Sequence, residues 1–325
     1  MTKKTPALAM QPGLQDFFYR LSQCIKRSFP KAIKTAIWIL KITLPVSLAV
    51  SIFNYYGWIE LVTQHLTPAF RLIGLGGEAA LPFITGMLLN IYSVIAVISQ
   101  LSLDMREITI IAVMSLISHN LIIETMIQRK TGSRTWHMIV LRIGSSFVAA
   151  ALLNMVLPEM SQKIAFMADS QSAASIPEML YAWMISAFKL VLKIVILIVL
   201  LMILQAILQE FNLIKLLTKP LSPLLKLMGL PPSTSFLWIV ANTLGLAYGS
   251  AVMMEERNQG RITKKDADLL NYHVAISHSN LEDLLLFAAI GVSIPWMLVP
   301  RIIIAMVAVW LRRWTQRPAQ MPDHS

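Results

Sequence analysis

Two short polar segments of this 325-residue chain contain residues that could bind a proton, a metal ion or a polar solute. The first is Ser118-His119-Asn120 followed by Glu124, and the second is Ser277-His278-Ser279-Asn280 followed by Glu282 and Asp283. An imidazole near a carboxylate suits proton exchange or coordination of a divalent cation. The same groups can equally hydrogen-bond the polar edge of an organic solute. His119, His278 and Glu282 are therefore the metal-ligand candidates within a wider predicted substrate site.

The spacing inside the two segments predicts two different geometries. Residues four apart share a helix face, so His278 and Glu282 are expected to point into one cavity. The step of five from His119 to Glu124 is expected to turn that carboxylate well round the helix from the imidazole. The alternative to a functional site is a hydrogen-bond cluster that locks helices together. Because there are two histidines and each is followed by a carboxylate, a functional site is favoured over a structural cluster.

Both segments lie within hydrophobic stretches of a strongly apolar chain. Hydrophobic residues make up 56% and charged residues 14% of the sequence, against about 25% charged residues in soluble proteins. Six stretches approach the roughly 20 residues that cross a bilayer, namely 35–53, 108–127, 138–157, 187–208, 269–290 and 296–311. Each histidine falls near the middle of its stretch. Ionisable residues at that depth normally face the protein interior. These features predict an all-α polytopic membrane protein.

The chain repeats itself, which indicates two copies of one module. Residues 57–75 align without a gap with 212–230, and the later pairs include Tyr92 with Tyr248 and His119 with His278. The predicted organisation is an interfacial amphipathic segment (1–30), a first repeat (31–158), a linker (159–186), a second repeat (187–313) and a tail (314–325).

Basic residues decide between two predicted topologies. Each half holds a further apolar segment with polar or glycine breaks, 78–100 and 233–255, which either spans the membrane or re-enters it as a hairpin. With two hairpins, 20 Lys and Arg residues lie inside and 3 outside; with two spans the division is 16 to 7. The first division fits the positive-inside rule better. It leaves three crossings per half, so the second repeat is predicted to be inverted, with both termini in the cytoplasm.

The broken segments are expected to complete the site. Non-helical backbone is tolerated at membrane depth only where it lines a cavity or is buried in protein. The predicted contributors are Asn90, Tyr92, Asn242, Thr243 and Tyr248. Close helix packing by small residues is the alternative interpretation of these breaks.

Other classes of function find little support in the sequence. The net charge of +11 collects in loops beside hydrophobic stretches, and no nucleic-acid motif is present. No metalloprotease, Walker, dinucleotide or nucleophile-elbow motif occurs, so we expect no enzyme. Lys41, Lys193, Arg142 and Arg301 lie within predicted spans. Those close to a span end are expected to snorkel to the interface, whereas the paired lysines could have a partner in the protein.

The duplicated module resembles the nucleoside recognition or gate domain. The resemblance rests on Leu66-Thr67-Pro68 and Leu221-Ser222-Pro223, each followed by Gly-Leu, a broken helix and a Ser-His segment with a later acidic residue. Similar modules occur in spore maturation proteins, in the membrane part of ferrous iron transport protein B and in concentrative nucleoside transporters. The chain lacks the cysteine of the ferrous transporter's gate hairpins, its GTP-binding domain and the glutamate-bearing hairpin of nucleoside transporters. The resemblance therefore does not identify iron or a nucleoside as the substrate.

The sequence as a whole predicts a bacterial inner-membrane permease that works by alternating access. Its expected partners are membrane lipid and a small solute, either nucleoside-like or a cation, and a homo-oligomer is compatible with the sequence. No cofactor is evident beyond a coupling ion, a proton or sodium. A non-transporting scaffold of the spore maturation type is the main alternative, and an intramembrane metal-dependent enzyme is a weaker one.

Overall fold

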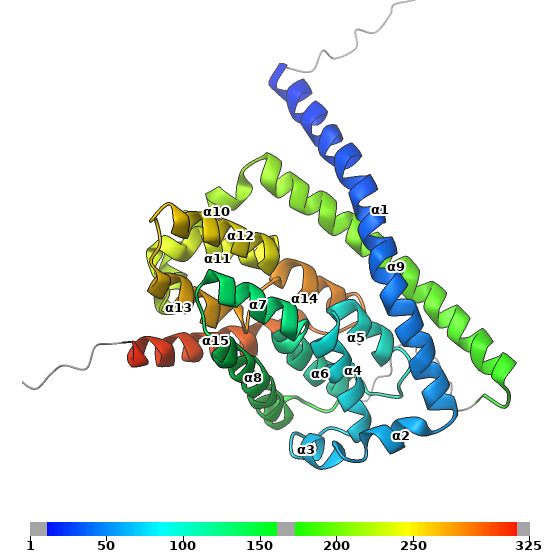
Figure 1. The fold of residues 1–325 in the computed structure, drawn as a ribbon. Helices are drawn as coiled ribbons and strands as arrows, with labels where there is room; N and C mark the ends of the chain where they lie inside the picture. Colours follow the sequence, from blue (N-terminus) through cyan, green and yellow to red (C-terminus); the bar gives the residue numbers. More distant parts are fainter. Residues whose placement is uncertain (1–11, 161–172, 317–325) are drawn as a thin grey trace, which may run out of the picture.

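The computed structural model describes residues 12–160 and 173–316, and these residues form helices and loops without a β-strand (Figure 1). Five helical stretches in this part of the chain are long and apolar enough to cross a membrane. They are Asp16–Tyr55, Met105–Thr131, Thr135–Val156, Ile176–Glu210 and Ile294–Thr315. The prediction of an all-α polytopic membrane protein is confirmed.

Two long helices, α1 (Pro12–Tyr55) and α9 (Ile176–Glu210), lie side by side and antiparallel along one edge of the molecule (Figure 1). At one end of the pair Arg20 Nε lies 2.9 Å from Glu210 Oε1, and at the other Trp183 Nε1 donates to Ser47 Oγ at 3.2 Å. Buried aliphatic residues recur at helical spacing on both, as on Leu190, Ile194 and Ile198 of α9. The amphipathic segment predicted at 1–30 is helical from Pro12 and continues without a break into the first span.

The described elements follow the same order in both halves. The helices α2 (Trp58–Thr63) and α3 (Thr67–Arg71) correspond to α10 (Leu213–Leu227), and η1 (Gly77–Ala79) corresponds to η2 (Pro232–Thr234). The last helix of each half, α8 (Thr135–Val156) and α15 (Ile294–Thr315), has the same length, with both ends offset by 159 residues. Opposite insertion of the halves in a bilayer remains a prediction, which the antiparallel α1 and α9 favour.

The broken apolar segments fold back as pairs of short helices. The first pair is α4 (Ala80–Leu88) and α5 (Ile91–Ile98), and the second is α11 (Ser235–Thr243) and α12 (Leu246–Asn258). At 1.5 Å per residue, the nine-residue α4 is about 14 Å long, roughly half of a bilayer's hydrocarbon core. The members of each pair pack against one another. Each segment is therefore a helical hairpin, and its entry and exit on one side of the membrane remain a prediction.

The histidine-bearing stretches are broken at the histidines themselves. The first divides into α6 (Met105–Ser118) and α7 (Leu121–Thr131), and the second into α13 (Lys264–Val274) and α14 (Asn280–Ala288). The prediction of a continuous span over 269–290 is therefore wrong, because α13 and α14 are separate short helices. Five of the six predicted stretches therefore coincide with a candidate span, and a crossing by α13 and α14 together, as a broken helix, remains a prediction. An argument from one shared helix face does not apply across either break. The linker residues 161–172 and the tail residues 317–325 lie outside the described residues.

Candidate functional site

The two helix breaks have the same backbone geometry. Asn120 has a φ of 49° and follows His119, and Ser279 has a φ of 49° and follows His278. Each of these left-handed residues donates its backbone N–H to a carbonyl of the facing hairpin. Asn120 N lies 2.8 Å from Gly86 O, and Ser279 N lies 3.1 Å from Ala241 O. A left-handed conformation is costly for most residues, so these hydrogen bonds help to hold each break in place.

A buried arginine caps the carbonyl groups that each break exposes. Arg142 on α8 donates from Nε to Ile117 O at 2.8 Å and from Nη2 to His119 O at 2.7 Å. Arg301 on α15 makes the equivalent bonds, to Ile276 O at 3.1 Å and His278 O at 3.0 Å. Helix C-termini leave carbonyls without intrahelical partners, and a charged donor makes strong hydrogen bonds to them.

Both arginines have 0% of their surface exposed. The expectation that span arginines snorkel is therefore wrong for Arg142 and Arg301, which point inward because they have partners there. One signal in the sequence could have identified them: their separation of 159 residues equals that of the two histidines.

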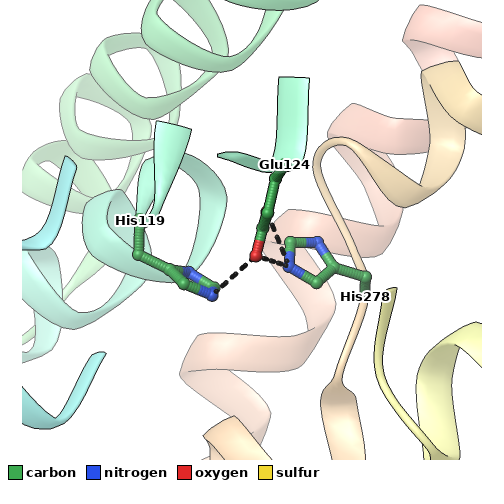
Figure 2. A group of neighbouring side chains, drawn as sticks. All are labelled: His119, Glu124 and His278. Atoms are coloured by element: carbon green, nitrogen blue, oxygen red, sulfur yellow. Dashed lines mark hydrogen bonds and ion pairs between the residues drawn. The ribbon is translucent and has the colours of Figure 1, made fainter. Parts of the chain in front are cut away.

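The centre of the site is Glu124, which lies between the two histidines (Figure 2). Glu124 Oε1 is 3.3 Å from His119 Nε2, and Glu124 Oε2 is 3.1 Å from His278 Nε2. Arg142 Nη2 approaches Oε2 at 2.7 Å, and the two imidazole ring centroids are 5.2 Å apart. The three residues of Figure 2 are at most 7% exposed, so the structure brings polar groups from both halves together away from solvent.

The predicted pairing of His278 with Glu282 is wrong. His278 contacts Glu124 of the other half, whereas Glu282 Oε1 accepts a hydrogen bond from the Tyr92 hydroxyl at 2.8 Å. These two residues line a separate cavity of about 160 Å³, with Thr35 and Gln205 among its other walls. The predicted separation of His119 from Glu124 is also wrong, because the break after His119 lets α7 change direction.

The set that could hold a metal ion changes accordingly. One ligand atom from each of His119, Glu124 and His278 lies within 4.8 Å of the others, and Glu282 is not part of this group. Asp283 is instead the acidic residue of the second segment that lies close to the group, with its Oδ2 3.7 Å from His119 Nε2. Two neutral imidazoles and a carboxylate are ligands that suit divalent metals, although Arg142 already occupies an oxygen of Glu124.

The remaining predicted residues divide into those that join the site and those that do not. Asn280 links the halves of the second break, since its Nδ2 donates to Asn242 Oδ1 at 2.6 Å and to Ser277 Oγ at 3.1 Å, and its Oδ1 accepts from Arg301 at 2.9 Å. Ser118 and Thr243 donate to carbonyls of their own helices, and Asn90 caps α5. Tyr248 is 49% exposed and does not join the buried cluster.

The two broken elements, their hairpins and the buried charged centre define a membrane protein of the gate-domain class. Residues 36–131 match the family model described as "Nucleoside recognition", named Gate. The chain is 32% identical over 274 residues to the uncharacterized membrane protein YvoD of Bacillus subtilis (strain 168), and the alignment covers 83% of this chain and 88% of that protein. This chain therefore belongs to the nucleoside recognition (gate) family. No solved structure matches it.

Proposed function

We propose that the protein is a bacterial inner-membrane permease that moves a small solute by alternating access and couples this movement to protons. The observation that carries the proposal is the meeting of two imidazoles, one from each half, on the single carboxylate of Glu124. Ionisable residues in membrane segments normally mark substrate, ion or proton pathways. Sites between two repeats with broken helices are a common transporter arrangement.

The hydrogen bonds of the histidines support the coupling to protons. Nδ1 of His119 lies 3.0 Å from Ser115 O, and Nδ1 of His278 lies 2.7 Å from Val274 O. A backbone carbonyl can only accept, so Nδ1 carries the hydrogen, and in neutral imidazole Nε2 then has a lone pair. That lone pair faces an oxygen of Glu124 on each side. A hydrogen bond between Glu124 and either ring therefore needs an additional proton, carried by Nε2 or by the carboxylate. A protonated Glu124 could donate to only one of the two rings.

The charge of the surroundings supports the same proposal. Two buried guanidinium groups, Arg142 and Arg301, stand against the two buried carboxylates of Glu124 and Asp283. The half-buried Glu282 adds one negative charge. With neutral histidines this group of five carries one net negative charge, which a single added proton neutralises. Because unpaired charge is costly in a dry interior, protonation of one histidine is the state we expect at rest.

The substrate class is the finer part of the proposal. A polar organic solute, nucleoside-like in size and hydrogen bonding, can exchange with the hydrogen bond from Asn280 Nδ2 to Asn242 Oδ1, which involves no charged group. A divalent cation is the second candidate, favoured by the ligand atoms of His119, Glu124 and His278. It would have to compete with Arg142 for Glu124, where the Nη2–Oε2 distance is 2.7 Å. We therefore place the organic solute first.

The experiment begins with purified protein and a thermal-stability screen against nucleosides, nucleobases and divalent metal salts. A compound that stabilises the protein is then tested for uptake into proteoliposomes, with and without an imposed pH gradient. We expect uptake that rises when the gradient drives protons in the direction of transport. Binding linkage predicts about 2.7 kcal/mol of stabilisation at a hundredfold excess over Kd.

The matched variants are His278→Gln and His65→Gln. Glutamine keeps hydrogen-bonding groups but cannot carry a proton, so His278→Gln is expected to abolish uptake while leaving membrane insertion intact. His65 is an exposed histidine on the loop before α3, and its variant is expected to retain uptake. Unchanged uptake in His278→Gln would refute the site. If no compound were taken up and both variants kept full stability, the alternative function of a non-transporting membrane scaffold would be favoured.

A further inference from the structure

A groove between α8 and α15 lies outside the site and has no part in the proposed transport. Its volume is about 600 Å³, within the range of small-molecule sites. The walls are mainly apolar and include Val140, Leu141, Val148, Ile304 and Val307. Gly144 opens its floor, because a Cβ added there meets no atom within 4 Å. A glycine inside a helix costs about 1 kcal/mol relative to alanine, so this open floor has a cost that an occupant would explain.

One end of the groove is polar and positively charged. His137 Nδ1 lies 3.2 Å from the Tyr272 hydroxyl, and the Arg312 guanidinium lies over the Tyr272 ring at 5.1 Å from its centroid. Arg134 also acts electrostatically on Tyr272. The only carboxylate described in contact with this end is Asp268, which binds Arg312 Nε at 2.7 Å. Two arginines against one aspartate leave one net positive charge at the mouth.

A second apolar groove runs along the other side of α15. It has a volume of about 350 Å³ and is lined by Ile303, Met306, Trp310 and Trp314. Val307 and Leu311 line both grooves, so the two are separated by a single ridge of α15. Tryptophan is enriched where membrane meets water, and Trp310 and Trp314 lie toward the end of α15 that carries Arg312.

We propose that these paired grooves bind an anionic phospholipid. One acyl chain lies in each groove, on either side of α15, and the phosphate lies at the mouth formed by His137, Arg312 and Arg134. Two adjacent apolar grooves on either side of one helix, the larger with a charged end, match two acyl chains and one headgroup better than they match a helix of a second copy. The positively charged mouth lies beside residues 134–137 and 312–315, which belong to segments whose positive charge predicts a cytoplasmic position. Clusters of Lys and Arg at that face attract anionic lipid.

The position of the groove suggests what the lipid does. The groove separates α8 and α15, which carry the two capping arginines. Gly144 is two residues from Arg142, and Ile304 is three residues from Arg301. A lipid between these helices would set their spacing and would therefore stabilise both breaks. This inference does not depend on the identity of any transported solute.

Native mass spectrometry of the detergent-purified full chain tests the proposal. Protein is mixed with phosphatidylglycerol and phosphatidylcholine in equal amounts, and the retained lipid is counted. One net positive charge near the headgroup predicts about a fivefold preference for phosphatidylglycerol. Gly144→Leu, which fills the floor, is expected to lose retention of both lipids. Leu192→Trp adds bulk at an exposed position of α9 and is expected to retain them.

The variant Arg134→Gln tests the contribution of the lipid headgroup separately from that of the acyl chains. Arg134 is exposed, so its replacement should leave the fold intact, retain lipid and bring the preference close to one. Should Gly144→Leu fail to fold, Val148→Trp blocks the same groove from a position that is 53% exposed. Wild-type lipid retention in the filled variants would overturn the proposal. It would also be overturned if filling converted a dimer to a monomer without loss of lipid, since a second copy would then be the occupant.

Discussion

The two helix breaks share one backbone arrangement, and their carboxylates differ by a single methylene group. In each, a histidine is followed by a left-handed residue, a carboxylate stands five positions after the histidine, and an arginine 23 positions after it caps the exposed carbonyls. Glu124 contacts both imidazoles and Arg142. Asp283, its counterpart, is one methylene shorter and lies 3.7 Å from His119. The shorter side chain leaves the first half to supply the central carboxylate for both.

The arginines reflect the same difference. Arg142 binds the carboxylate of Glu124 in addition to its two carbonyls, whereas Arg301 binds the amide oxygen of Asn280. Duplication therefore supplied two equal scaffolds, and the substitutions that followed made them unequal. A symmetric pair would offer two equivalent binding positions. The observed pair offers one carboxylate between two imidazoles, which is suited to passing a proton between the halves.

The comparison predicts that the two arginines are unequal in stability. Arg142→Met leaves Glu124 as a buried charge without its closest partner, which costs about 3–5 kcal/mol. Arg301→Met leaves carbonyls and an amide without donors, a loss of about 1–3 kcal/mol. The free energy of unfolding in detergent, from denaturant titration followed by circular dichroism, measures both.

Two controls sharpen this test. Arg129 is exposed, and Arg129→Met is expected to change stability by less than about 0.5 kcal/mol. The double variant Arg142→Met, Glu124→Gln should recover part of the loss, because the orphaned charge is removed. Equal losses in the Arg142 and Arg301 variants would remove the distinction drawn between the breaks.

Exchange of the carboxylates tests the difference of one methylene directly. Glu124→Asp is expected to withdraw the carboxylate from His278 and Arg142, and a misplacement of about 1 Å can reduce a rate a hundredfold. Asp283→Glu is expected to retain uptake within about threefold, at an overpacking cost of roughly 1–3 kcal/mol. Proteoliposome uptake, normalised to inserted protein, measures both variants.

The outcome of this exchange bears on the proposed function as well as on the comparison. If Asp283→Glu were the more damaging variant, Asp283 would be the central carboxylate and the role given to Glu124 would be wrong. Unchanged uptake in both variants would place the transport path elsewhere.

The composition and the internal repeat were sufficient to predict the helical class, the two hairpins and the pairing of His119 with His278. They were insufficient for the contacts. Helical periodicity assigned His278 to Glu282 because it assumed that the helix continues. No glycine or proline stands at either break to indicate otherwise, and of the two left-handed residues only Asn120 is of a type that tolerates this conformation well.

The capping arginines illustrate a second limit. An arginine in an apolar stretch is compatible with snorkelling or with burial, and the choice depends on partners that lie more than 20 residues away along the chain. Arg142 meets the carbonyl of His119, and Arg301 meets that of His278. Such long-range contacts appear only when the halves are assembled. The equal spacing of the two arginines and the two histidines was the one indication that the sequence contained.

The smallest effect we expect concerns the left-handed residues themselves. Ser279→Gly should relieve more strain than Asn120→Gly, because asparagine adopts this conformation more readily than serine and glycine adopts it without a steric penalty. The gain is partly offset by the greater chain entropy of glycine in the unfolded state. We expect Ser279→Gly to stabilise by about 0.5–1 kcal/mol and Asn120→Gly by less, measured as above. A loss of stability in Ser279→Gly would mean that the serine side chain makes a stabilising contact at the second break, and the strain attributed to Ser279 would not be the dominant effect there.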